Sequence, residues 1–371
     1  MCIRFFAFCG LFFWQPLYAD ITEKTEAYSV LATEVVTGLD HPWSMAFLPD
    51  GHLLITERSG QLLLIDKTGK RQIVTGLPEI SVKGQGGLLD VVLHPDFESN
   101  HWVYFSFAAQ DSTGIGTEVA RGRLEDNSLK GVEQLFSLEP KSRTGRHFGS
   151  RLAFDRQNYL YITLGDRGEK LRAQDLNDHA GSVIRLHDDG RIPRDNPFLD
   201  KKKHQPEIFS YGHRNIQGAF VHPQTDELWL HEHGPQGGDE LNISRRGRNY
   251  GWPIITYGVN YFTGTKIGEG TKKAGMEQPL YYWVPSIAPS GMAFYNANKF
   301  PQWKNNLLIG SLKFQTLVRL EIENAKVTHE ERIFKKKLGR IRDVKVGPEG
   351  FVYLLTDADE GKLIKLEPVL K

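Results

Sequence analysis

The sequence predicts an all-β protein built as a six-bladed β-propeller. One pattern, an apolar run followed by a turn and a second strand of alternating character, occurs six times along the chain. The equivalent turn positions are Pro49, Pro95, Arg156, Pro223, Asn296 and Pro348, separated by 46 to 73 residues. A four-stranded blade needs about 40 to 50 residues, so the longer spacings leave room for loops inserted on one face. No helical periodicity or strand–helix alternation is sustained, which disfavours an α/β fold.

The repeats predict pairs of neighbouring strands. In chain order the pairs are 44–51 with 53–56, 89–95 with 102–107, 151–155 with 159–164, 218–223 with 227–231, 291–295 with 306–310, and 342–350 with 351–356. Residues 28–36 precede the first repeat, and we expect them to pair with the last blade and close the ring. Closure removes an exposed sheet edge. A pair of β-sandwiches with an accidental repeat is the alternative.

The first 19 residues have the layout of an export signal. Arg4 precedes an apolar stretch over 5–14, and a small residue, Ala19, ends the segment. The apolar stretch is too short to span a bilayer as a helix. Cleavage after Ala19 would remove both cysteines and leave one domain over 20–371. A lipid anchor on Cys9 is the alternative, but the residues before it lack the small side chains that such processing prefers.

The charge balance favours a small-molecule ligand or a protein partner. Lys and Arg total 46 and Asp and Glu total 45, a net charge of +1, which disfavours a nucleic-acid partner. No later apolar run reaches the ~20 residues of a membrane span, so we expect a soluble periplasmic protein, either a monomer or a homodimer. The chain has no dinucleotide fingerprint, Walker motif or nucleophile elbow.

Three glycine-rich segments before predicted strands carry polar side chains suited to a ligand site. Gln85 lies within Gly-Gln-Gly-Gly, where the backbone can approach a ligand closely, although a simple turn explains the glycines equally well. His147 lies between glycines and is a candidate general base, although a single histidine is often structural. Arg214 and Asn215 offer a guanidinium and an amide for a carboxylate or carbonyl oxygen, or for a loop salt bridge.

The segment 231–240 suggests a cation site. His231 and His233 resemble a zinc pair, but no third ligand is evident. Hard oxygen donors fit calcium better, and they are Asp239, Glu240 and the backbone carbonyls around Gly234 and Pro235.

A set of basic residues suggests an anion pocket. Arg340 and Arg342 alternate along one strand and so face the same side, where two like charges meet only if an anion or acidic group lies between them. Asp343 points the other way. Basic residues usually face solvent, but together with Lys313 and Arg214 this pair predicts a pocket for a multiply anionic ligand.

These residues, in this order, resemble the soluble PQQ-dependent glucose dehydrogenase family, most closely its aldose sugar dehydrogenase branch. The shared motifs span nearly the whole chain after the export signal, and they are 41–43, 84–90, 145–149, 212–215, 232–242, 249–253 and 340–343. The resemblance implies a six-bladed propeller that binds pyrroloquinoline quinone (PQQ) and calcium at the mouth of its channel.

The resemblance also implies a role for each matching residue. His147 matches the base that takes the proton of the anomeric hydroxyl as the C1 hydride passes to the quinone. Gln85 matches a side chain beside the sugar, and Arg214 and Asn215 match contacts to the quinone oxygen. Groups that bind the cofactor carboxylates are matched by Lys313, Arg340 and Arg342, and positions near the cofactor by Gln174 and Tyr261. Calcium ligands are matched by the carbonyls of Gly234 and Pro235 at the cofactor, and by Glu240 and the carbonyl of Tyr250 at a second, structural ion.

The sequence departs from the glucose dehydrogenases in two ways. Arg146 precedes His147 where those enzymes carry an aspartate, so a carboxylate that assists the base must come from elsewhere or be absent. The chain is also shorter between the fourth and fifth repeats, where loops shape the sugar pocket, which favours a broad aldose range over glucose alone.

Three functions therefore compete. The leading hypothesis is a periplasmic quinoprotein that oxidises aldoses at C1 to lactones and passes the electrons to an external acceptor. The alternatives are a calcium-dependent propeller hydrolase acting on lactones, with His147 as base, and a non-enzymatic propeller that binds sugar or protein. The cation cluster favours the first, because neither a neutral lactone nor a protein surface requires an anion pocket.

Overall fold

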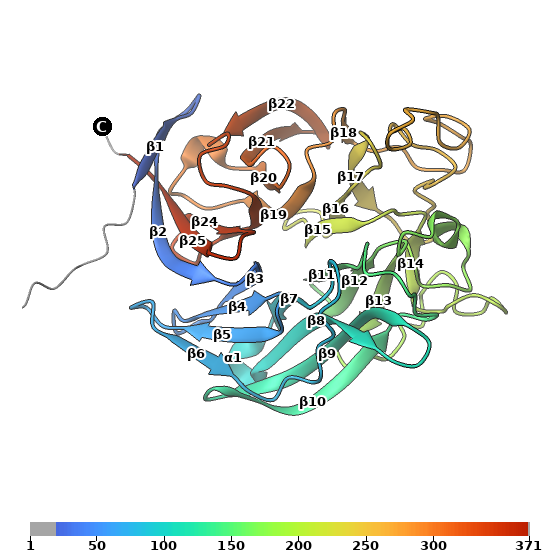
Figure 1. Cartoon of the computed structure of the whole chain (residues 1–371), viewed down its shortest axis with the longest axis horizontal. Coiled ribbons are helices and arrows are strands. Elements are labelled where there is room, and N and C mark those ends of the chain that lie inside the picture. Colours follow the sequence, from blue (N-terminus) through green and yellow to red (C-terminus); the bar gives the residue numbers. More distant parts are fainter. Residues whose placement is uncertain (1–19, 370–371) are drawn as a thin grey trace, which may run out of the picture.

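The computed structural model describes residues 20–369 and confirms the six-bladed β-propeller. Six antiparallel sheets are arranged around a central axis (Figure 1). The predicted export signal, 1–19, lies outside the described residues. No helix among residues 20–369 is long and apolar enough to cross a membrane.

In blades 1 to 5 the strands run outward from the axis in chain order. Blade 1 is β3 (Pro42–Phe47), β4 (Leu53–Glu57), β5 (Gln61–Ile65) and β6 (Arg71–Val74), and blade 2 is β7 (Leu88–Leu93), β8 (Trp102–Gln110), β9 (Ile115–Glu125) and β10 (Ser128–Ser137). Blade 3 is β11 (Gly149–Phe154), β12 (Tyr159–Leu164), β13 (Ser182–His187) and β14 (Ile208–Tyr211), and blade 4 is β15 (Ile216–Val221), β16 (Leu228–Glu232), β17 (Asp239–Ser244) and β18 (Tyr281–Trp283). Blade 5 is β19 (Pro289–Tyr295), β20 (Asn306–Ser311), β21 (Thr316–Glu323) and β22 (Lys326–Ile333). The helices are α1 (Phe97–Asn100) and the 3-10 turns η1 (Lys170–Gln174) and η2 (Pro301–Trp303).

The N-terminal segment closes the ring, as predicted. Blade 6 contains β23 (Ile341–Val346), β24 (Val352–Thr356) and β25 (Gly361–Pro368), and its outer strands are β2 (Ser29–Leu39) and β1 (Ile21–Lys24). β2 pairs antiparallel with β25, from Val30 opposite Pro368 to Leu39 opposite Gly361. The first strands of successive blades contact one another around the axis, and β23 contacts β3. Pairing the two ends of the chain leaves no gap in the ring.

The hydrophobic core lies between blades. Each pair of neighbouring blades shares one apolar cluster, so that, for example, Tyr295 and Leu308 of blade 5 pack with Val344 and Leu354 of blade 6. Every predicted repeat supplies the first two strands of one blade, because those strands are buried on both faces and so carry the strongest apolar signal.

A buried ion cluster ties the first strands together at the axis. Arg151, at the start of β11, lies 3.2 Å from Asp90 of β7 and 3.0 Å from Asp343 of β23. Its Nε donates to the carbonyl of Gln217 in β15 at 2.8 Å, and its guanidinium lies 4.2 Å from the ring centre of Trp43 in β3. Counting its own blade, this one arginine thereby contacts five of the six blades.

Replacing Arg151 by methionine should lower the free energy of unfolding by about 3–5 kcal/mol, because two buried carboxylates would lose their common cation. Chemical denaturation measures the change. Arg156→Met is the matched control, since this arginine is half-exposed and a surface substitution costs at most about 0.5 kcal/mol. A loss below 1 kcal/mol for Arg151→Met would show that the cluster does not hold the blades together.

Candidate active site

One end of the propeller collects the polar residues that the sequence singled out. Each first strand begins at this end and each second strand finishes there, so the loops before first strands and after second strands meet at the channel mouth. In all six blades the pairing of the first and second strands shifts register near the start of the first strand. Such bulges redirect side chains, and here they lie directly beside the candidate site.

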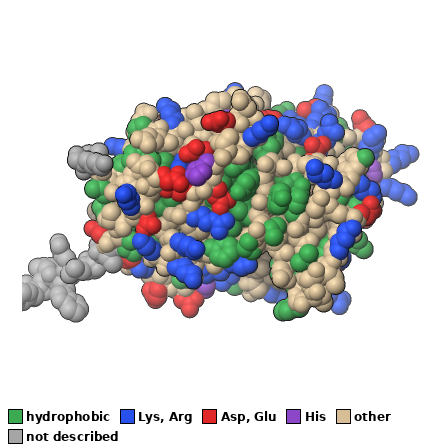
Figure 2. Space-filling model, turned by 90° about the horizontal axis from the view of Figure 1, so that it is seen from above, with side chains coloured by type: hydrophobic (Ala, Val, Ile, Leu, Met, Phe, Trp, Pro, Cys, Tyr) green, Lys and Arg blue, Asp and Glu red, His purple; other side chains and the backbone are tan. Residues whose placement is uncertain are grey.

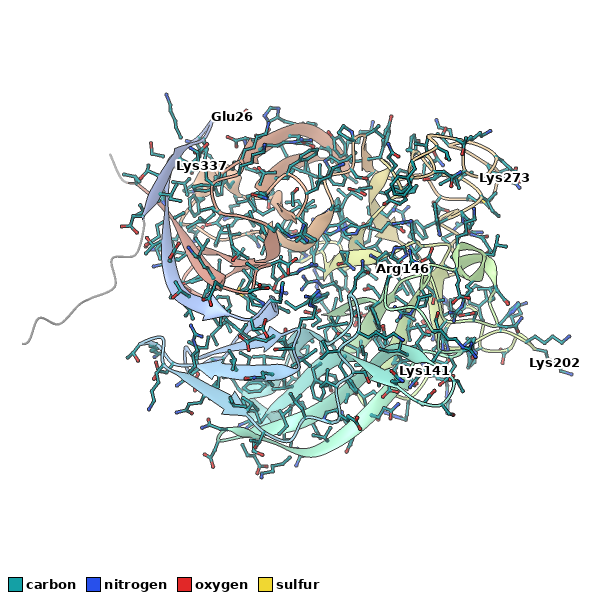
Figure 3. The ribbon with its side chains drawn as sticks, in the orientation of Figure 1. Glu26, Lys141, Arg146, Lys202, Lys273 and Lys337 are labelled. Carbon is teal, nitrogen blue, oxygen red and sulfur yellow. The ribbon has the colours of Figure 1, made fainter. Side chains whose placement is uncertain are left out.

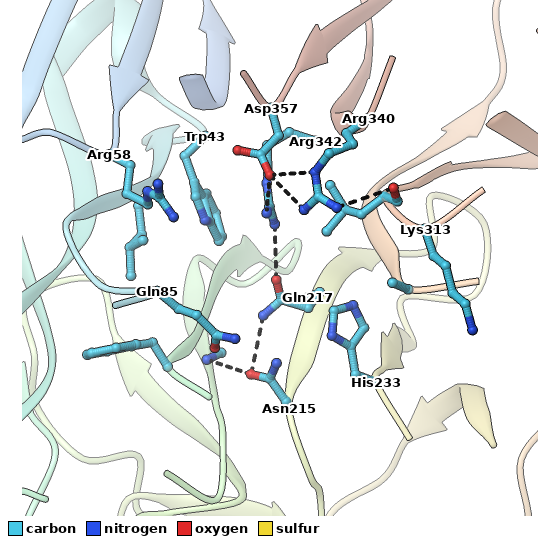
Figure 4. Close-up of a pocket in the computed structure, with 15 residues that line it drawn as sticks. Trp43, Arg58, Gln85, Asn215, Gln217, His233, Lys313, Arg340, Arg342 and Asp357 are labelled. Carbon is cyan, nitrogen blue, oxygen red and sulfur yellow. Dashed lines mark hydrogen bonds and ion pairs between the residues drawn. The ribbon is translucent and has the colours of Figure 1, made fainter. Parts of the chain in front are cut away.

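A cationic pocket of about 440 Å³ opens at this end (Figure 4). Its lining includes four basic side chains and one carboxylate, and these are Arg58, Lys313, Arg340, Arg342 and Asp357. The predicted cations Lys313, Arg340 and Arg342 are therefore together. On the surface in Figure 2, by contrast, basic and acidic side chains are interspersed. The near-neutral total charge thus conceals a local excess of positive charge.

Asp357 is the acidic group between the two arginines. It follows β24 and accepts from Arg340 Nη2 at 2.9 Å, from Arg342 Nη2 at 3.3 Å and pairs with His41 Nδ1 at 3.0 Å. Burial favours the neutral acid, but the charge of Arg342 and the hydrogen bonds of His41 and Arg340 hold the pKa of Asp357 far below its usual range. One carboxylate does not balance four cations, so the pocket remains suited to an anion.

Amide side chains form the floor of the pocket. Asn215 Oδ1 accepts from the Gly149 backbone at 3.2 Å and from Gln217 Nε2 at 3.3 Å, and Gln217 Oε1 accepts from Arg342 Nη1 at 3.3 Å (Figure 4). The Asn215 amide therefore has its orientation set by neighbours. His233 contacts the Pro289 carbonyl through Nε2 at 2.7 Å, and burial lowers the pKa of His233 to about 3, so the ring is neutral.

A second cavity of about 760 Å³, here called the base pocket, adjoins the first, since Gln85 lines both. His147 lines it with a side chain that is 13% exposed. The backbone of His147 is left-handed, with φ of 55°, and its N–H donates to Gln85 Oε1 at 2.7 Å. A Cβ on Gly165 would lie 2.1 Å from the His147 carbonyl, so glycine is required where the chain passes beneath the histidine.

Asp166 is the carboxylate beside His147. Its Oδ1 lies 2.6 Å from His147 Nδ1, and its Oδ2 accepts from Trp252 Nε1 at 2.8 Å. The aspartate follows β12, so the missing carboxylate comes from elsewhere, as the sequence left open. With the Nδ1 proton directed to Asp166, the lone pair of Nε2 is available to a substrate.

Electrostatics keep His147 in its neutral form. Burial lowers the pKa of His147, the hydrogen bond to Asp166 opposes this, and the charges of Arg214 and Arg167 lower it further. Burial raises the pKa of Asp166, but the hydrogen bond with His147 and the positive charge of Arg214 keep the pKa of Asp166 below its usual value. The pair therefore combines a neutral imidazole with an ionised carboxylate, as a general base requires.

The remaining predicted cofactor residues divide between the two pockets and their surroundings. Arg214 and Tyr261 line the base pocket, and Arg214 Nη1 donates to the carbonyls of Gly234 at 2.7 Å and His233 at 3.1 Å. Gln174 lines neither pocket, because its Nε2 donates to the carbonyl of Trp252 at 2.7 Å. Gln174 therefore supports the tryptophan that holds Asp166.

The predicted calcium ligands lie in two places. Pro235 lines the base pocket, and a cation bound at the Gly234 carbonyl would have to share or displace Arg214 there. Glu240 lies directly opposite Glu232 across β16 and β17, and burial and the charge of Glu232 hold the pKa of Glu240 well above its usual range. Two facing carboxylates fit a cation between or beside them. Within the described part of the chain, no hydrogen bond reaches the Tyr250 carbonyl.

The zinc interpretation has no support. Residues 20–369 contain no group of three or more His, Cys, Asp or Glu side chains that could hold a metal ion. An ion bound by the described residues would therefore need oxygen ligands besides side-chain carboxylates, and backbone carbonyls, which calcium accepts, can supply them.

Three side chains that line the pockets were not predicted from the sequence. Arg58 and Asp357 come directly after the second strand of a repeat and Asp166 comes two residues after one, whereas Gln85, His147 and Arg214 lie before first strands. In a propeller both positions lie at the same end. A charged residue one or two positions after the second apolar run was the signal that could have found all three.

Comparisons with known proteins place the chain among sugar dehydrogenases. The family model described as Glucose / Sorbosone dehydrogenase matches residues 39–365. The aldose sugar dehydrogenase of Escherichia coli (strain K12) is 46% identical, over 96% of this chain and 98% of the relative. The crystal structure of the soluble aldose sugar dehydrogenase from Escherichia coli in the apo-form superposes with a TM-score of 0.89 at 46% identity, over 92% of this chain and 100% of the other. The PQQ-bound aldose sugar dehydrogenase from Streptomyces coelicolor gives a TM-score of 0.74 at 27% identity, over 90% and 96%.

Proposed function

Because the chain belongs to the glucose/sorbosone dehydrogenase family and is an oxidoreductase of the aldose sugar dehydrogenase type, we propose that it oxidises aldoses at C1 to lactones with bound PQQ and calcium. We further propose that it acts in the periplasm and passes the electrons to an external acceptor. The observation that carries the proposal is a buried His147–Asp166 pair in a pocket that adjoins a cationic cavity.

The cationic pocket fits a tricarboxylate. Arg58, Lys313, Arg340 and Arg342 face one cavity with Asp357 as its single carboxylate, so three positive charges remain for three carboxylates. Trp43 and Phe148 add flat apolar surface to the same lining. These residues would hold PQQ, which when bound supplies the quinone that accepts a hydride from the sugar.

The residues of the base pocket act on the sugar. His147 Nε2 takes the proton of the anomeric hydroxyl, while Asp166 stabilises the imidazolium that forms. Trp252 holds Asp166 in place through its indole N–H. Gln85 fixes the backbone of His147 and faces both pockets. Arg214 and Asn215 provide N–H donors where negative charge develops during hydride transfer.

The direct test is reconstitution. Purified protein is mixed with PQQ and calcium, and aldoses and an artificial dye acceptor are then added. We expect the cofactor to bind and the dye to be reduced in proportion to the lactone formed. Cofactor binding without aldose-dependent dye reduction would refute the proposed activity. Hydrolysis of lactones without cofactor would support the hydrolase, and sugar binding without turnover would support the binding protein.

Calcium should raise the melting temperature by a few degrees, because an ion that binds only the folded state stabilises it by about 2.7 kcal/mol at 100 times its Kd. Glu240→Gln should remove much of this increase. The substitution should also stabilise the calcium-free protein, since it relieves the repulsion from Glu232. Calorimetry with calcium or a chelator measures both effects, with Glu98→Gln as an exposed control. An undiminished calcium effect in Glu240→Gln would remove this residue from the ligands.

A further inference from the structure

The base pocket has an excess of positive charge at its rim. Arg146 and Lys170 both line it, and within residues 20–369 no ion pair or side-chain hydrogen bond engages either charged group. Arg146 lies across Gly168, where a Cβ would come within 3.2 Å of its Cδ and Nε. Gly168 has φ of 77°, a conformation that also favours glycine. The loop after β12 therefore leaves room for the arginine beside the pocket.

The acidic side chains in the same lining are already engaged. Asp166 accepts from His147, Trp252 and the Gly168 backbone. Glu169 accepts from Ser142 Oγ at 2.5 Å and lies 3.5 Å from Arg172. Neither carboxylate pairs with Arg146 or Lys170.

The third basic side chain at this rim is neutralised. Arg172 lies 2.6 Å from Asp178, a carboxylate outside the pocket lining. Arg214, deeper in the pocket, has no carboxylate partner among the described residues either, but its Nη1 is held by the carbonyls of Gly234 and His233. Arg146 and Lys170, which come from the loops on either side of β11 and β12, are therefore the cations free to bind a ligand at the rim.

We propose that the base pocket is specific for aldoses that carry an anionic group, a carboxylate or a phosphate ester, which Arg146 and Lys170 bind. The proposal rests on the proposed function, in which His147 receives the anomeric proton. Arg146 is the neighbour of His147 in the chain, so one sugar can place its reducing end at the base and its anionic group at the rim. A neutral aldose leaves both cations without a partner. The guanidinium suits either anion, because it forms paired hydrogen bonds to carboxylate or phosphate oxygens.

The test compares sugars that differ in this group alone. We expect kcat/KM for glucuronate and for glucose 6-phosphate to exceed that for glucose by about tenfold, since partly exposed ion pairs contribute modestly. A preference for glucuronate alone identifies a carboxylate site, and one for glucose 6-phosphate alone a phosphate site. If kcat/KM for both anionic sugars were equal to or below kcat/KM for glucose, the proposal would be overturned.

Matched double variants locate the effect. Arg146→Gln with Lys170→Gln should bring the ratio of anionic to neutral kcat/KM to within about twofold of one. Arg191→Gln with Lys202→Gln removes the same charges from exposed positions and should leave the ratio unchanged. In Figure 3 Arg146 lies toward the centre of the ring and Lys202 at its outer edge. A ratio that falls equally in both double variants would mean that overall charge, and not this site, sets the preference.

A binding measurement separates this proposal from the proposed function. Methyl glycosides have no free anomeric hydroxyl, so they bind without being oxidised. Titration calorimetry should show methyl β-glucuronide binding about tenfold more tightly than methyl β-glucoside, and the Arg146/Lys170 double variant should lose the difference. Equal binding of the two glycosides would refute the anion site while leaving aldose oxidation intact. Tighter glucuronide binding in a protein that oxidises no aldose would support the anion site and refute the proposed function.

Discussion

His147→Gln should lower kcat for aldose oxidation by about 10²–10⁴-fold and leave PQQ affinity within a few-fold, because the substitution removes a general base and no cation of the cofactor pocket. Glutamine has a similar volume and can still donate a hydrogen bond to Asp166, so the loop should keep its shape. Steady-state dye reduction measures kcat, and titration calorimetry measures cofactor binding. A kcat within threefold of the unsubstituted protein would exclude His147 as the base.

The pH profile tests the same pair in another way. The pKa of His147 is lowered below 6.5, so the neutral base predominates above pH 6.5. In a plot of activity against pH, the activity should therefore fall on the acidic side, at a pH below 6.5. Asp166→Asn removes the carboxylate that opposes this shift, so the acidic fall in activity should move to still lower pH while kcat decreases. Asp175→Asn, at an exposed carboxylate near η1, is the control. If activity fell at the same pH in Asp166→Asn as in the unsubstituted protein, Asp166 would have only a structural role.

Replacing Arg340 and Arg342 together by glutamine should weaken PQQ binding by more than about 100-fold. Hydrogen bonds to charged groups contribute about 1.5–3 kcal/mol each, and about 1.4 kcal/mol corresponds to a factor of ten in Kd. The variant also reduces the net charge of the pocket from three to one, with Asp357 still present. Calorimetric titration with PQQ measures the change.

The sugar preference of the Arg340/Arg342 double variant should stay unchanged although its PQQ affinity falls, because neither arginine lines the base pocket. Ratios of kcat/KM between aldoses, measured at saturating cofactor, should stay constant. Arg245→Gln with Arg246→Gln is the matched control at half-exposed positions. If this control weakened PQQ binding as much as the Arg340/Arg342 variant, the anion-pocket argument would fail.

The predicted strand pairs all fell on the first and second strands of blades, since these strands are bounded by turns and buried on both faces. The third and fourth strands left no comparable repeat, because partly exposed outer strands such as β6 and β22 mix polar and apolar residues. The sequence predicted the strand that closes the ring, β2, over 28–36. Its extent to Leu39 depends on pairing with β25, more than 300 residues away.

The residues of the candidate site likewise divide into those that carry a local sequence signal and those that only the structure could place. His147, Gln85 and the clustered cations carry a local signal, either flanking glycines or like charges in alternation. Gln174 matched a position near the cofactor, but its side chain donates to the Trp252 carbonyl and lines neither pocket. Local spacing does not determine which side of a loop faces a cavity, and the hydrogen bonds of Asn249 and Trp252 decided it here.

The sequence alone determined the repeat, the number of blades and the residue types that an anionic cofactor and a proton acceptor require, because these depend on apolar periodicity and on the chemistry of single side chains. Only the tertiary structure decided which carboxylates serve them. Asp166 reaches His147, and Asp357 lies between Arg340 and Arg342, because antiparallel pairing within a blade brings the end of the second strand beside the start of the first. Ring closure then brings Arg58, Lys313 and Asp357, from three different blades, to one pocket, and no spacing along the chain encodes that.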